Sequence, residues 1–265
     1  MDPTFPAVPA VPAVTIARVS DGQWQALDDD GRVAGDGAAW PRPDGRLFLS
    51  IDCWHDATFE RLSAAMLAAL PRPLYTTVDE ADPAQRIQWE RLGFTAGRRE
   101  WVVRVPTDPQ VTGLGAVRPP AGVTVLPLGA ADKDPLRALD RAIRAEVEAT
   151  VGWREMPAEV LPRLDDATVI DPTKYAVAAE GGRYVGLLRL APVPRQPRIG
   201  LVAVLADRQR HGIARALLAD VLGSLHRSGV RAATGEVGAA NAAAAALFNT
   251  IGAERAGSNL EVVLH

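Results

Sequence analysis

Hydrophobic and polar residues in the first part of the chain follow the patterns of short strands and two helices. Strand-like segments bounded by turn sequences occur at residues 24–27, 33–40, 46–52, 74–78 and 100–105. Leu62, Met66 and Leu70 recur at the spacing of one helix face. A second helix is predicted over 82–94, between an N-capping aspartate and a terminating glycine. The predicted order is β-β-β-α-β-α-β.

The second part of the chain repeats this mixture with longer helices. Strands are predicted at 123–128, 198–205, 231–237 and 260–264, with a hairpin over 175–192 that turns at Gly181 and Gly182. Helices are predicted over 136–147, 156–164, 213–225 and 241–252. Strand 198–205 lacks polar alternation, so we expect both of its faces to be buried. Alternating strands and helices predict an α/β protein (an α+β mixed sheet).

The length of the chain and the position of a Pro- and Gly-rich segment suggest two domains. The 265 residues exceed a typical single domain. Residues 106–122 are rich in Pro and Gly and are predicted to be a linker between a first domain, 15–105, and a second domain, 123–265. Four prolines within residues 1–14 predict a disordered leader or, alternatively, an arm that packs on a partner.

The two predicted domains resemble each other near their ends. Residues 78–94 align with residues 237–253 without a gap, which places Asp82 on Asn241, Trp89 on Phe248 and Gly93 on Gly252. Helix caps alone make short helices look alike, but this register favours an internal duplication.

Net charge, cysteine count and the length of apolar runs argue against several classes of function. With 29 Lys+Arg against 32 Asp+Glu, the net charge of −3 argues against a nucleic-acid binder. The single Cys53 leaves no disulfide framework and no Cys-rich zinc site, so no metal is expected. No apolar run is long enough for a membrane helix, and no signal peptide is recognisable, so a cytoplasmic location without membrane partners is expected.

The chemically informative stretch is LVAVLADRQRHGIARALLADVL, residues 201–222. An apolar strand runs through a turn with Arg210 and Gly212 directly into an amphipathic helix. Glycine allows close approach of the backbone, and the N–H groups at the start of a helix attract phosphate. The pattern therefore suits a diphosphate, although an ordinary strand-to-helix turn would look similar. Neither the P-loop motif nor G-x-G-x-x-G is present.

Residues Gln209–Ala214 resemble the Q/R-x-x-G-x-G/A motif of the GNAT superfamily of acetyl-CoA-dependent N-acyltransferases. Upstream, Val204–Asp207 is similar to that family's V-x-P-E, with Ala in place of Pro. Downstream, Glu236, Asn241 and Phe248 resemble the family's next strand and helix. The resemblance covers residues 123–265 fully and 23–105 in degenerate form. It implies a tandem GNAT fold, in which a mixed sheet is splayed between its fourth and fifth strands.

The same resemblance implies the ligand and its contacts. Acetyl-CoA would enter the splayed gap as co-substrate, with an amine of a small molecule or peptide as acceptor. The implied cofactor-binding residues are Val202, Ala203, Val204, Gln209, Arg210, His211, Gly212, Ile213, Ala214, Arg215, Asn241 and Phe248. For Asn241, a plain N-cap is the alternative.

Acetyl transfer needs a base for the amine. Glu236 is the candidate catalytic residue, because it ends the strand beside the expected splay and resembles a position that a catalytic glutamate occupies in some family members. A surface glutamate at a strand end is the alternative. Glu146 and Glu148 lie on the first long helix and are expected to be solvated. His211 lies within the phosphate turn, where its backbone matters more than its ring. Phe248 departs from the family, which often has Tyr there as general acid, because Phe has no proton to donate.

Four further residues have no assigned role in this prediction. His55 and His226 are expected at the surface. Trp153 and Arg154 either line an acceptor pocket or pack in the core or at the surface. The segment 51–62 contains no Gly where the first copy should have its phosphate turn, so that copy is predicted not to bind CoA. The sequence thus predicts an N-acetyltransferase, monomeric or homodimeric. A non-catalytic acyl-CoA sensor or scaffold and a structural α/β module are the alternatives.

Overall fold

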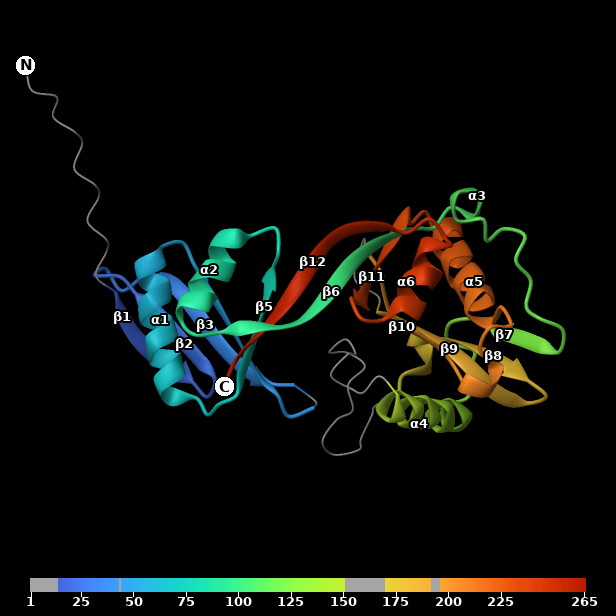
Figure 1. Cartoon of the computed structure of the whole chain (residues 1–265), viewed down its shortest axis with the longest axis horizontal. Coiled ribbons are helices and arrows are strands. Elements are labelled where there is room, and N and C mark those ends of the chain that lie inside the picture. Colours follow the sequence, from blue (N-terminus) through green and yellow to red (C-terminus); the bar gives the residue numbers. More distant parts are fainter. Residues whose placement is uncertain (1–13, 43, 151–169, 192–195) are drawn as a thin grey trace, which may run out of the picture. The chain divides into compact units, whose positions relative to one another are not determined.

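A computed structural model of the chain describes residues 14–42, 44–150, 170–191 and 196–265 (Figure 1). The predicted leader, apart from Val14, and the predicted helix 156–164 lie outside these residues. The chain divides into two compact units. The first comprises the described residues up to Thr77 with Trp89–Ala96 and Glu261–His265, and the second comprises Val78–Gln88 and the described residues of Gly97–Leu260.

The elements of the first part are β1 (Thr15–Ser20), β2 (Gln23–Leu27), β3 (Val33–Pro41), β4 (Leu47–Cys53), α1 (Asp56–Ala69), β5 (Leu74–Asp79), α2 (Pro83–Arg91) and β6 (Thr95–Pro106). The predicted order is confirmed except for β1, an additional antiparallel partner of β2. Unit 1 has the strand order β1-β2-β3-β4-β5, followed by the end of β12 and the start of β6. Helix α1 buries Phe59, Leu62 and Met66 against strands of this unit.

The elements of the second part are α3 (Pro109–Thr112), β7 (Val123–Leu126), α4 (Lys133–Ala149), β8 (Tyr175–Glu180), β9 (Arg183–Ala191), β10 (Arg198–Val204), α5 (Ile213–Arg227), β11 (Ala232–Gly238), α6 (Ala242–Asn249) and β12 (Glu254–Leu264), with short 3-10 turns η3 (Pro172–Lys174) and η4 (Ala206–Arg208). The predicted segments within the described residues are confirmed. Residues 106–122, predicted as a linker, contain α3 and bury Leu114 in the core of unit 2.

The sheet of unit 2 is mixed, with the strand order β12-β6-β11-β10-β9-β8-β7. Strands β10 and β11 pair in parallel, whereas β10–β9, β9–β8, β8–β7 and β6–β11 pair antiparallel. Figure 1 shows α4 on one face of this sheet and α5 on the other. Leu217 and Leu222 of α5 are buried in one cluster, and Leu136 and Leu139 of α4 in a second. A mixed sheet flanked by helices is the fold class that the sequence predicts.

Strands β6 and β12 are exchanged between the two units, because each contributes residues to both. Strand β6 follows α2 in sequence but pairs with β11 in unit 2, from Glu100↔Gly238 to Pro106↔Ala232. Strand β12 follows α6, and its end lies beside β5 in unit 1. Because of this exchange, the compact units are not continuous stretches of sequence. The domain boundaries at 105 and 123 remain a prediction.

Candidate active site

The central strands of unit 2 separate soon after they meet. Strands β10 and β11 pair at Arg198↔Thr234 and Ile199↔Gly235, and no further pairs follow. Strand β10 continues to pair with β9 through Val204. Among the described residues, the edge of β10 that faces away from β9 therefore has no strand partner beyond Ile199. We call the position of the last pair, Ile199↔Gly235, the vertex.

A β-bulge at the vertex decides which backbone groups face the split. The register of β10 on β9 shifts between Ile199 and Leu201. The Leu205 N–H donates to Val185 O at 3.0 Å. Alternate residues of an antiparallel pair direct their backbone groups to opposite sides, so Ala203 faces β9, whereas Val202 and Val204 face the split. Of the three predicted backbone contacts, this register favours Val202 and Val204.

The predicted phosphate turn links β10 to α5. Arg210 and Gly212 both have left-handed backbones, with φ values of 67° and 86°. Gly212 is the N-cap residue of α5, so the unpaired N–H groups of the first helical turn begin directly after it. Side chains of Arg210, His211 and Arg215 are exposed around the turn. The arrangement has the properties of a backbone anion site with added positive charge.

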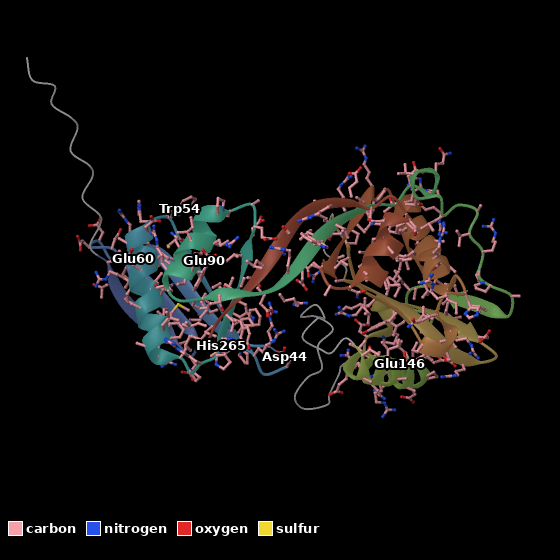
Figure 2. All side chains as sticks on the ribbon, viewed as in Figure 1. Asp44, Trp54, Glu60, Glu90, Glu146 and His265 are labelled. Carbon is pink, nitrogen blue, oxygen red and sulfur yellow. The ribbon has the colours of Figure 1, made fainter. Side chains whose placement is uncertain are left out.

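Two side chains hold this turn in place. The Gln209 Nε2 donates to Val204 O at 3.0 Å, which ties the turn back to the strand. The Ala206 N–H donates to the Glu146 carboxylate at 3.0 Å, and Figure 2 labels Glu146 on α4. Glu146 is only partly exposed, whereas Glu148 is exposed. The expectation of a solvated side chain is thus confirmed for Glu148, and Glu146 instead orients the turn.

Helix α6 brings Asn241 and Phe248 to the other side of the split. The Asn241 side chain accepts a hydrogen bond from the Ala244 N–H at 3.0 Å, so Asn241 is an N-cap. Its side-chain amide N–H groups are a separate part of the residue and are not needed for this cap. Phe248 is 6% exposed, and its Cζ lies 3.5 Å from the position that a Cβ on Gly235 would take. The ring therefore packs at the vertex.

The candidate base Glu236 lies one residue beyond the vertex on β11. Its carboxylate is 3.4 Å from Nη1 of Arg198, and both side chains are about a quarter exposed, at 24% and 25%. Thr234 and Glu236 alternate with Ala233, Gly235 and Val237, and Ala233 and Val237 belong to the core on the α5 face. Glu236 therefore points to the α4 face. On that face it forms the ion pair with Arg198.

Sequence reasoning missed a group of polar residues on the α4 face. Asp140 of α4 is 2% exposed and binds the Arg144 guanidinium at 2.5 Å. Tyr175 of β8 lies opposite Arg189 of β9. Burial raises the pKa of the Tyr175 phenol, although Arg189 and Arg144 oppose the shift, so the hydroxyl stays protonated at neutral pH. An arginine inside the apolar strand LLRLA was the sequence signal for this group.

Of the remaining candidates, two lie at the surface and two lie outside the described residues. His55 and His226 are exposed, as expected for surface residues. Trp153 and Arg154 lie outside the described residues. Within the part of the chain that the structure describes, no group of three or more His, Cys, Asp or Glu is arranged to hold a metal ion. A search of the same residues finds no helix long and apolar enough to span a membrane.

Comparison with known proteins agrees with this geometry. Residues 140–253 match the model of the acetyltransferase (GNAT) family, so the chain contains a GNAT domain in its C-terminal part. No curated protein matches the chain in sequence.

Several solved structures share the fold over nearly the whole chain. A GCN5-related N-acetyltransferase from Sphaerobacter thermophilus is 19% identical with a TM-score of 0.65, over 94% of this chain and 82% of its own. A tandem GNAT protein from the clavulanic acid biosynthesis pathway is 17% identical with a TM-score of 0.66, over 96% and 84%. A GCN5-related N-acetyltransferase from Kribbella flavida is 14% identical with a TM-score of 0.59, over 95% of this chain and 89% of its own. At these identities the likeness establishes the fold, which is that of GNAT proteins, including a tandem one.

Proposed function

We propose that unit 2 transfers an acetyl group from acetyl-CoA to an amine of a small molecule or peptide. The observation that carries this proposal is the split after Ile199↔Gly235, which leads along β10 into a left-handed turn and the start of α5. A strand edge without a partner can hydrogen-bond an extended ligand arm, and the turn can hold a diphosphate at its end. Few ligands other than an acyl-CoA combine an amide-rich arm with a diphosphate.

In this proposal each part of CoA meets a different element. The pantetheine arm pairs with the backbone of Val202 and Val204. The diphosphate lies against the N–H groups from Arg210 to Arg215, with the Gln209–Val204 bond fixing the turn. The Asn241 side-chain amide reaches the arm from α6, and the Phe248 ring packs beside the thioester at the vertex.

Acetyl transfer then proceeds by direct attack in a ternary complex. The amine nitrogen forms a bond to the thioester carbonyl carbon, the carbon–sulfur bond breaks, and its electron pair leaves on the CoA sulfur. Glu236 accepts the proton that the amine loses, directly or through water. We therefore expect Glu236→Gln to lower kcat by about 100-fold, the low end for a general base.

Phe248 favours one alternative function. Its side chain has no proton to give to a leaving thiolate. A non-catalytic acyl-CoA sensor or scaffold would have the same turn and vertex. Tight acetyl-CoA binding without turnover on a broad panel of amines would support this alternative over the transferase.

Paired glycine variants test CoA binding. Gly212 and Gly229 stand at opposite ends of α5, and both have left-handed backbones, with φ values of 86° and 79°. Gly212→Asp adds strain and a negative charge where the diphosphate should lie, so we expect acetyl-CoA affinity to fall by about 100-fold or more in calorimetric titration. Gly229→Asp adds similar strain at the far end and should leave the affinity unchanged. Equal losses in both variants would contradict the assignment of the turn.

A further inference from the structure

Arg189 presents a buried guanidinium nitrogen beside the vertex. Arg189 alternates with Leu188 and Leu190, which belong to the core on the α5 face, so its side chain points to the α4 face. Its Nη1 is buried and has no hydrogen-bond partner among the described residues. The same atom lies 3.0 Å from the position that a Cβ on Gly200 would take. Gly200 is the residue at the β-bulge, so the guanidinium lies where β10 leaves β11.

Two carboxylates on the α4 face of this sheet are engaged by other arginines. Asp140 binds Arg144 at 2.5 Å, and Glu236 binds Arg198 at 3.4 Å. The Tyr175 phenol, which lies opposite Arg189, is uncharged at neutral pH. Neither of these two carboxylates is hydrogen-bonded to the Arg189 Nη1.

A buried guanidinium N–H without an acceptor is unfavourable, because it has lost water without gaining a protein partner. The planar fork of arginine matches a carboxylate, whose two oxygens can accept parallel hydrogen bonds. The structure thus has a buried donor and a shape that an anionic group of a reactant would satisfy. The glycine at the bulge leaves room for the guanidinium at this point.

We propose that Arg189 binds a carboxylate carried by one of the two reactants, and that it determines substrate specificity. This inference rests on the proposed function, since it places the reacting carbonyl at the vertex. The carboxylate could belong to the acceptor, as in an amino acid, or to the acyl group, as in a dicarboxylic acyl-CoA. The chemistry at Arg189 is the same in both cases, and two experiments separate them.

The first experiment tests the acceptor with a product analogue, so it needs no turnover. N-acetylglycine and N-acetylglycinamide differ only in the carboxylate. With the protein saturated in CoA, we expect N-acetylglycine to raise the melting temperature by about 2 °C or more, and the amide to have no effect. Arg189→Gln should abolish this difference. The control Arg141→Gln, which changes an exposed arginine of α4, should retain it.

The second experiment tests the acyl group by calorimetric titration of succinyl-CoA and acetyl-CoA. If the acyl group carries the carboxylate, succinyl-CoA should bind about 10- to 100-fold more tightly than acetyl-CoA, and Arg189→Gln should remove that preference. Arg189→Lys keeps the charge without the fork and should retain only part of it. This variant also serves if Arg189→Gln does not fold.

The outcomes distinguish this inference from the proposed function. A carboxylate preference in either experiment that depends on Arg189 supports the inference and identifies the reactant. Normal acetyl-CoA binding with no carboxylate preference in either experiment overturns the inference and leaves the transferase proposal intact. Absence of any acyl-CoA binding to the folded wild type contradicts the proposed function and this inference with it.

Discussion

Two segments of the chain have the same order of elements and the same way of separating. In β10–α5–β11–α6, the parallel strands pair at two positions and then part. In β4–α1–β5–α2, the parallel strands pair at Leu47↔Leu74 and Phe48↔Tyr75. The strand-to-helix links differ. Eight residues join β10 to α5, whereas two, Trp54 and His55, join β4 to α1.

Both segments share the arrangement of strands, but only the link between β10 and α5 has the backbone of an anion-binding turn. The C-terminal link contains two left-handed residues and ends on the N-cap of α5. The N-terminal link has none, and Trp54, labelled in Figure 2, is 94% exposed. A parallel pair that separates can therefore occur without an anion-binding turn beside it. We propose on this ground that the N-terminal segment does not bind CoA.

The second helices of the two segments agree more closely than the links. Asp82 accepts from the Gln85 N–H at 3.0 Å, just as Asn241 accepts from the Ala244 N–H. Trp89 is buried like Phe248. Gly93 and Gly252 are both left-handed, with φ values of 90° and 68°. These agreements support our proposal that the segments are copies of one ancestor, of which the first has lost its site.

The largest expected effect concerns the exchanged strands. Leu260, Val262 and Leu264 of β12 are all buried. Ending the chain after Asn259 removes three buried apolar side chains, each of which stabilises folding by about 1.5–3 kcal/mol. Because typical total stability is about 5–15 kcal/mol, unit 1 should lose cooperative unfolding. Circular dichroism melting and amide exchange measure this loss, with removal of His265 alone as the control. Unchanged protection of unit 1 would show that the exchange contributes little.

The paired aromatic residues should show the next largest effect. Trp89→Ala and Phe248→Ala should each lower the free energy of unfolding by about 3–5 kcal/mol in urea titration, because each empties a buried site. Only Phe248→Ala should also weaken acetyl-CoA binding, by about tenfold, since only that ring lies beside the proposed thioester position. Equal effects of the two variants on CoA binding would contradict the difference between the segments.

A smaller effect is expected at Arg210. It is the only non-glycine residue among those described that has a positive φ. Arg210→Gly should raise the free energy of unfolding by about 0.5–1 kcal/mol, because glycine adopts this backbone without strain. The loss of one guanidinium should weaken acetyl-CoA binding a few-fold. Trp54→Gly in the other link should give no gain in stability, since His55 beside it has φ −123° and the link has no left-handed residue.

An effect of similar size is expected at the matched caps. Asp82→Ala and Asn241→Ala should each cost about 1 kcal/mol of stability in thermal unfolding, the usual cost of a lost N-cap. If Asn241 also binds the pantetheine arm, only Asn241→Ala weakens acetyl-CoA binding. Unchanged affinity in Asn241→Ala would restrict this residue to its capping role.

Local patterns predicted most of the elements and the turn, because helix periodicity, caps and turn glycines act over a few residues. They missed β1, whose residues are exposed or only partly buried and so carry no apolar alternation. The exchange of β6 and β12 could not be predicted, since a strand pattern does not specify its partner. The role of Val202 and Val204 rather than Ala203 depends on the bulge, and the position of Arg189 depends on the pairing of β8, β9 and β10.

The most direct test of the difference between the segments is the stoichiometry of acetyl-CoA binding to the wild-type chain in calorimetric titration. Binding at one site per chain, lost in Gly212→Asp and retained in Gly229→Asp, is the result that we predict. Two sites per chain would show that the N-terminal segment also binds CoA. No binding to the folded wild type would contradict the account of the β10–α5 turn and leave unit 2 as a structural module.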